Sequence, residues 1–201
     1  MIKRRPWIGV LAAATVLALV SLASNVTTES QLSGEADTIL AVRSTLSRLL
    51  NAGVVWGGLA VLAGRLVRRP LPAVAAGVLS GLAALAVHYA AGTLTGMFDA
   101  DIWRYNAHWF VAAAVTGGPL GLVGAITHRE DRWGLAARLV IPAGAVLEPF
   151  VLGWFTAPTL LPWPTRVAGY IAGAVLVAAG ALGGLRALSR RRTGSRVGSP
   201  G

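Results

Sequence analysis

The chain has 201 residues, of which 55% are hydrophobic and 13% charged, and its mean hydropathy is +0.64. Soluble domains carry about 25% charged residues, so this composition excludes an ordinary soluble fold and indicates a membrane protein. The chain has no cysteine, which excludes disulfides, thiolate metal sites and cysteine nucleophiles.

The net charge of +10 does not predict a nucleic-acid partner. The basic residues stand at the ends of apolar runs, where positive charge sets the orientation of a membrane protein. No segment remains to build a basic face on a soluble domain. We therefore expect the lipid bilayer, with no nucleic acid, as the main partner.

Six apolar runs are long enough to cross a bilayer, since a transmembrane helix needs about 20 apolar residues. They cover residues 7–24, 49–66, 71–93, 107–127, 136–156 and 167–187. Backbone groups in lipid must bond within the protein, and no alternating strand pattern is visible. We predict an all-α integral membrane helical bundle over residues 1–188, followed by a disordered basic tail at 189–201.

The first run also has features of a signal peptide. Lys3, Arg4 and Arg5 precede it, and Ser21-Leu22-Ala23 is a small-x-small sequence typical of a cleavage site. The run is slightly long for the apolar region of a signal peptide, which favours an uncleaved first helix.

Residues 25–48 form the longest polar connection. Ile39, Val42, Leu46 and Leu49 recur at helical spacing in its second half. This pattern predicts either a helix lying on the membrane surface or an extension of the second span, and both remain open here.

Basic residues predict the orientation. If the N-terminus is inside, 14 of the 18 basic residues fall on the cytoplasmic side. The outer side then keeps Arg43, Arg48, Arg104 and Arg166. Such asymmetry predicts that both termini are cytoplasmic, in a bacterial inner (plasma) membrane.

Glycine and proline predict how the helices pack and bend. Gly-x-x-x-Gly pairs begin at residues 53, 77, 117, 169 and 180, and small residues one turn apart let helices approach closely in lipid. We expect ordinary packing within the bundle. Pro119, Pro142 and Pro149 are expected to bend or locally unwind the fourth and fifth helices.

The fifth run carries an acid, Glu148, at or just beyond its middle. A carboxylate at that depth is costly, so it usually faces the protein interior and has a partner. His88 shares a helical face with Gly81 and Gly77, which predicts that it points inward. We expect a polar or substrate-binding cluster in the outer half of the bundle, formed by Glu148, His88, His108, Arg166, Tyr89 and Tyr170.

Three interpretations of this cluster compete. In the structural one, Glu148 pairs with His88 or Arg166, or stays protonated and donates to a carbonyl freed by a proline. In the second, the cluster is a proton or substrate site of a small permease or a solute-binding subunit. In the third, His88, His108 and Glu148 serve intramembrane catalysis or hold a metal, although no nucleophile-elbow, His-Glu-x-x-His or phosphate-loop motif is present.

Three short motifs within residues 38–155 carry a resemblance: Leu50-Asn51 with Trp56, Gly117-Gly118-Pro119 with Gly121, and Leu147-Glu148-Pro149. On these motifs the chain resembles an uncharacterised family of small bacterial multi-pass membrane proteins, domain of unknown function 6518. The resemblance implies a multi-pass membrane fold, with no established activity or site.

A second resemblance rests on six predicted helices, Ala14-x-x-x-Ala18 in the first and a Gly-Pro-x-Gly element in the fourth. These features are similar to those of substrate-binding subunits of energy-coupling-factor vitamin transporters. That resemblance implies that the first-helix alanines contact a partner subunit.

The sequence thus leads to a non-enzymatic membrane scaffold or interaction protein of unknown process, with other membrane subunits as candidate partners. No cofactor and no metal are expected. The alternatives are a small-solute transport subunit with an outer-half polar cavity and an intramembrane enzyme.

Overall fold

The computed structural model describes residues 4–196, with side chains from Arg5 to Ser189. All regular structure in this part of the chain is helical. The helices are α1 (Arg4–Ser24), α2 (Glu29–Leu32), α3 (Asp37–Leu50), α4 (Gly53–Val67), α5 (Pro70–Leu94), α6 (Ile102–Tyr105), α7 (Ala107–Ile126), α8 (Arg132–Val151) and α9 (Trp163–Arg196). Six stretches of the described chain are long and apolar enough to cross a membrane.

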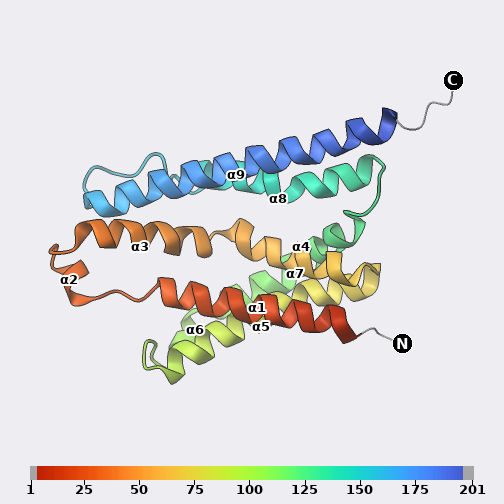
Figure 1. The fold of residues 1–201 in the computed structure, drawn as a ribbon. Helices are drawn as coiled ribbons and strands as arrows, with labels where there is room; N and C mark the ends of the chain where they lie inside the picture. The colour runs from red at the N-terminus through yellow and green to blue at the C-terminus, as the bar shows by residue number, and fades with distance from the viewer. Residues whose placement is uncertain (1–3, 197–201) are drawn as a thin grey trace.

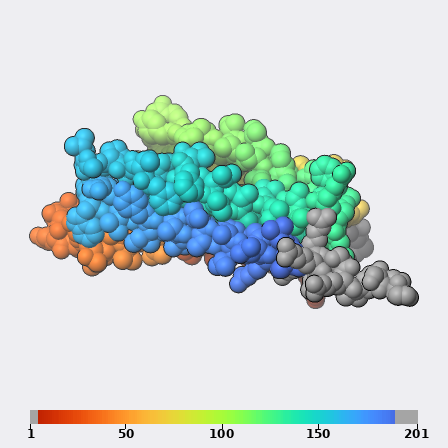
Figure 2. Space-filling view, turned by 90° about the horizontal axis from the view of Figure 1, so that it is seen from above, coloured from red at the N-terminus to blue at the C-terminus, as the bar shows by residue number. Residues whose placement is uncertain are grey.

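The long helices lie along one another in two groups (Figure 1). The first group is α1, α4, α5 and α7, in which α5 packs mainly on α7 and α4 packs on both. The second is the hairpin of α8 and α9, which lie side by side in Figure 2. α3 packs on α9 and also on α1, and therefore bridges the groups. α1 begins and α9 ends at the same end of the bundle (Figure 1).

The second span is a broken helix. α3 and α4 follow one another along the bundle, separated by Asn51 and Ala52 (Figure 1), and together they make one candidate span over Asp37–Val67. Ala41 and Thr45 of α3 are buried, while Ile39 and Val42 are exposed. The position of α3 in line with α4 is the arrangement that an extension of the second span predicts.

Two other predicted boundaries differ from those found. The fifth predicted run continues to 156, but α8 ends at Val151 because Gly153 adopts a left-handed conformation with φ 66° and turns the chain. At the other end of the chain, α9 continues to Arg196, past residue 189, where the disordered tail is predicted to begin. The rest of the predicted tail, 197–201, lies outside the described residues.

The unwinding expected at the prolines is not found. α7 is continuous across Pro119, and α8 is continuous across Pro142 and Pro149. Pro149 lies close to the end of α8, where its missing N–H removes little of the helical hydrogen bonding.

Close helix contacts are made at glycine, as the Gly-x-x-x-Gly pairs predict. A Cβ added at Gly117 would lie 2.8 Å from the carbonyl oxygen of Gly77, and one added at Gly77 would lie 2.8 Å from Cα of Gly121. A Cβ on Gly64 would overlap the carbonyl of Gly121. α4, α5 and α7 therefore touch backbone to backbone, the arrangement that small residues permit in lipid.

Ala14 and Ala18 of α1 are fully buried inside the chain itself. They pack in one cluster with Leu59 of α4 and Ala84 of α5. The expectation that these alanines contact a partner subunit is therefore wrong for this arrangement, because their surface is already covered by α4 and α5.

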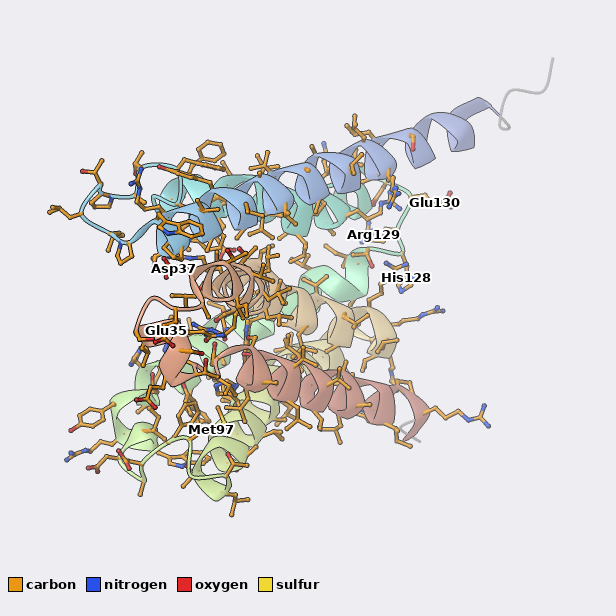
Figure 3. The ribbon with its side chains drawn as sticks, turned by 60° about the vertical axis from the view of Figure 1, so that its left-hand side comes forward. Glu35, Asp37, Met97, His128, Arg129 and Glu130 are labelled. Carbon is orange, nitrogen blue, oxygen red and sulfur yellow. The ribbon has the colours of Figure 1, made fainter. Side chains whose placement is uncertain are left out.

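Charged connections lie at the two ends of the bundle (Figure 3). Glu35 and Asp37 are at one end, and His128, Arg129 and Glu130 are at the other. Asp131 caps α8 by accepting a hydrogen bond from the Gly134 N–H at 3.0 Å. A hydrogen bond from the Arg129 guanidinium lowers the pKa of Asp131, so this cap stays ionised at neutral pH and is lost only in acid, as the pH falls through that lowered pKa.

We expect Gly121→Ala to destabilise the protein by about 1–3 kcal/mol, the usual cost of overpacking, because its Cβ would overlap the Ala73 carbonyl oxygen. The matched control is Gly58→Ala, since nothing lies within 4 Å of a Cβ at Gly58. Thermal unfolding of both variants in detergent measures the difference. Equal melting temperatures would contradict the close contact of α5 and α7.

Candidate functional site

The break between α3 and α4 leaves backbone groups without partners inside their own helices. Ala52 is extended, with φ −60° and ψ 136°, so α4 starts afresh at Gly53. The first N–H groups of any helix have no intrahelical acceptor, and lipid offers none in place of water. Gly53 lies 12 residues before the basic Arg65, about 18 Å along the helix axis, so the break falls well inside the candidate span Asp37–Val67.

Glu148 of α8 supplies the missing acceptors. Its Oε1 accepts from the Gly53 N–H at 2.6 Å, and its Oε2 accepts from the Val54 N–H at 2.7 Å. Each carboxyl oxygen of Glu148 accepts one N–H, so both amides at the start of α4 have an acceptor. The carboxyl group also lies at the positive end of the α4 dipole, where acidic side chains stabilise a helix.

The position of Glu148 on α8 follows from its neighbours. Ala145 is buried, and a Cβ on Gly144 would lie 3.4 Å from Val54 of α4. The side of α8 that carries these small residues therefore faces α4 and lets the carboxylate reach it. The sequence correctly predicted that Glu148 has a polar partner. The expected partners, His88, Arg166 or a carbonyl, are wrong, because the partners are two backbone amides.

The carbonyl side of the break is satisfied by neutral side chains. The Trp56 indole N–H donates to the Leu50 carbonyl at 3.0 Å, and the Asn51 amide donates to the Ser47 carbonyl at 2.9 Å. Asn51 also accepts from the Ser21 hydroxyl of α1 at 2.7 Å. Both halves of the break thus have partners, as a stable interruption of a membrane helix requires.

His88 and Tyr89 belong to a separate aromatic cluster at the end of α5. His88 is buried, as its helical face predicts, and its Nδ1 lies 3.2 Å from the Ala18 carbonyl oxygen. Its ring centroid is 6.3 Å from that of Trp56 and 5.7 Å from that of Phe98. The Tyr89 ring continues the cluster, with its centroid 6.1 Å from that of Phe98.

The remaining candidates lie apart. His108 is exposed at the start of α7, and its ring is 4.9 Å from that of Trp109. Arg166 and Tyr170 are half-buried on α9, and the Nε of Arg166 has no hydrogen-bond partner. No hydrogen bond or ion pair within the described side chains joins Glu148 to any of the other five candidates. The six residues therefore occupy several neighbourhoods, with no single polar cluster.

A metal centre is not assembled from the described residues. No three His, Asp or Glu side chains among them gather closely enough to hold an ion. The arrangement of His88, His108 and Glu148 that a metal-dependent activity would need is therefore not present in that part of the chain.

Comparison of the chain with protein-family models, with curated proteins and with solved structures finds no match. The site therefore has to be interpreted from its own geometry.

Sequence reasoning missed Gly53 and Val54 as the partners of Glu148. A signal was present, because Asn51-Ala52-Gly53 places two poor helix formers within an apolar run. Gly53 was instead interpreted only as part of a Gly-x-x-x-Gly pair. That the opposing helix would bring an acid to this break depends on tertiary packing.

We expect Glu148→Gln to lower stability by about 1–3 kcal/mol, because the carboxamide NH2 would face one of the two N–H donors and leave it unpaired. Glu130→Gln is the control, since Glu130 is exposed in the α7–α8 connection. Thermal unfolding in detergent, together with the amount of protein in membranes, measures the effect. A Glu148→Gln variant as stable as the control would contradict the capping role.

Proposed function

We propose that this chain is a multi-pass membrane protein that acts as a scaffold or interaction partner of other membrane subunits, without catalysing a reaction. The observation that supports this most directly is the state of Glu148. Both of its oxygens bind backbone amides of α4, so the strongest candidate for proton or substrate chemistry is engaged in holding the protein together. Close glycine contacts among α4, α5 and α7 add a rigid frame.

The proposal includes an orientation with both termini in the cytoplasm of a bacterial cell and the bundle in its plasma membrane. The basic residues clustered at the chain ends and at the α4–α5 and α7–α8 connections support this orientation. The start of α1 and the end of α9 lie at the same end of the bundle in Figure 1, which is consistent with an even number of spans. Membership in the family of small bacterial membrane proteins that the chain resembles is part of the same proposal.

A second candidate function is small-solute transport. It is favoured by the broken α3–α4 helix, because interrupted helices near the membrane midplane form substrate and ion sites in many transporters. In such proteins the N-terminus of the half-helix often faces an anionic substrate group. Here Glu148 occupies that place, so transport would require the carboxylate to leave its two amides.

Glu148→Gln separates the two functions. A scaffold requires the cap, so the variant should accumulate poorly or unfold at lower temperature. A transporter using Glu148 for chemistry predicts a variant that accumulates normally and loses uptake or ligand retention. Normal accumulation together with such a loss would overturn the scaffold proposal.

The interaction proposal predicts that one exposed helix face contacts another protein within the membrane. A photocrosslinking residue would be placed at Val16 of α1, Val115 of α7 or Leu182 of α9, all of which are exposed and point from different helices. Ala63, fully buried in α4, is the control position. We expect a discrete protein adduct at one exposed position. Adducts with lipid alone at all three would contradict the proposal.

The orientation is tested with reporter fusions after Gly201 and within residues 92–101, the connection at the end of the bundle away from the termini. We expect the first to report the cytoplasm and the second the opposite side, because the basic residues are retained inside. Signals on the same side would overturn the orientation.

A further inference from the structure

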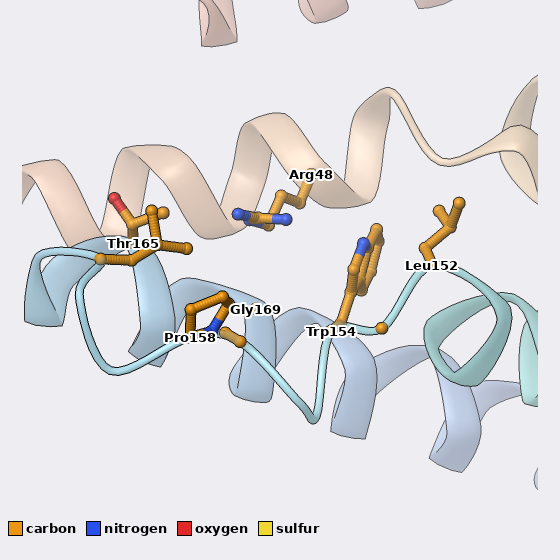
Figure 4. A pocket seen from close by; sticks show the side chains of 9 residues that line it. Arg48, Leu152, Trp154, Pro158, Thr165 and Gly169 are labelled. Atoms are coloured by element: carbon orange, nitrogen blue, oxygen red, sulfur yellow. The ribbon is translucent and has the colours of Figure 1, made fainter.

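A hollow of about 210 Å³ lies beside the connection from α8 to α9 (Figure 4). It opens between α3, the connection from α8 to α9, and the first turns of α9. Arg48 lies on one side, facing Trp154 and the connection. The lining is completed by Leu152, Gly153, Ala157, Pro158, Leu161, Thr165 and Gly169.

Arg48 brings an unpaired positive charge to this hollow. Its guanidinium carbon lies 5.7 Å from the centroid of the Trp154 ring, and none of its N–H groups donates to a described residue. Three other arginines have acceptors, whereas the Nε of Arg166, which is also half-buried, has none. Arg129 pairs with Asp131, Arg104 lies 3.8 Å from Asp101, and Arg43 donates to the Ser24 carbonyl at 3.2 Å. A half-buried guanidinium beside an indole ring, without a carboxylate, is suited to an anion from outside the chain.

The aromatic wall of the hollow is held in place. Trp154 is 9% exposed and packs with Ala52, Ala172 and Leu176, and its backbone N–H donates to the Pro149 carbonyl at 2.9 Å. A Cβ on Gly169 of α9 would lie 3.1 Å from the Trp154 carbonyl oxygen. The absence of a side chain at Gly169 therefore allows the connection from α8 to pack closely against α9. The indole is therefore a fixed surface, and Arg48 extends over it.

The rest of the lining is suited to an apolar body with a polar end. Leu152, Pro158 and Leu161 make the lining largely apolar, and Thr165 is its one neutral polar residue. The volume is below the 300–1,000 Å³ typical of sites for drug-sized molecules. A ligand of this site is therefore small, or inserts only one end.

We propose that this hollow binds an oxyanion, carboxylate or phosphate, carried on a small apolar body, with Arg48 holding the anion and Trp154 the apolar part. Two sources offer this chemistry: a free small acid, and the headgroup of an anionic lipid. The inference does not rest on the scaffold proposal, because neither Arg48 nor Trp154 is a partner of Glu148.

The test uses the full chain in phosphatidylcholine nanodiscs. One arm titrates hexanoate, with hexanamide as the uncharged match, and follows the melting temperature. The other adds phosphatidylglycerol and counts bound lipid by native mass spectrometry. Arg48→Gln removes the charge, and Arg104→Gln removes one charge from an exposed position at the same end of the bundle.

We expect wild type and Arg104→Gln to bind hexanoate or phosphatidylglycerol with equal affinity. The affinity of Arg48→Gln for the same probe should be at least tenfold lower. Hexanoate binding in pure phosphatidylcholine identifies a free acid, and binding of phosphatidylglycerol alone identifies a headgroup. If Arg48→Gln fails to fold, Arg48→Lys replaces it. A smaller loss of affinity is expected for Arg48→Lys, because lysine keeps the positive charge but lacks the planar guanidinium that binds an oxyanion through two N–H groups. Binding that is equal in Arg48 variants and wild type, equal for hexanoate and hexanamide, or absent for both probes would overturn the proposal.

Discussion

Two N–H groups of α4, on Gly53 and Val54, begin a helix partway along the bundle, where their own helix offers them no acceptor. Glu148 of α8, 95 and 94 residues away in sequence, accepts both. The bond pair makes a broken second span compatible with lipid. It also ties the α8–α9 hairpin to the group of α1, α4, α5 and α7, with α3 as the main other bridge. Leaving the Glu148 carboxyl group or the two amides without a hydrogen-bond partner would cost free energy. The two bonds between them remove both costs.

The two groups of helices are held together by different physical means. Within the first group, glycines bring α4, α5 and α7 into backbone contact, so small displacements meet steric resistance. Between the groups, α3 packs along α9, and Ala52 packs with Trp154 and Ala172. The two Glu148 bonds add a polar link between α8 and α4. Any movement of the hairpin relative to the first group has to stretch or break those bonds.

This division explains why the polar residues form separate neighbourhoods. His88 and Tyr89 lie in the aromatic cluster of the first group. Glu148 instead binds the start of α4. Arg48, on the bridging helix α3, instead faces the connection that follows α8. The proposed anion site therefore lies in the hollow beside Trp154, whereas Glu148 and His88 are bonded to backbone groups of the fold.

The sequence by itself determined the helical membrane-type architecture, the six candidate spans, the inward position of His88 and the need of Glu148 for a partner. Each of these follows from local quantities: apolar length, helical periodicity and the cost of a charge in lipid. It left undecided whether residues 39–49 lie on the surface or extend the second span, and it named the wrong partners for Glu148. Those outcomes were decided only by the tertiary structure, because a helix terminus exposes its amides wherever the chain breaks, and only packing brings a distant carboxylate to them.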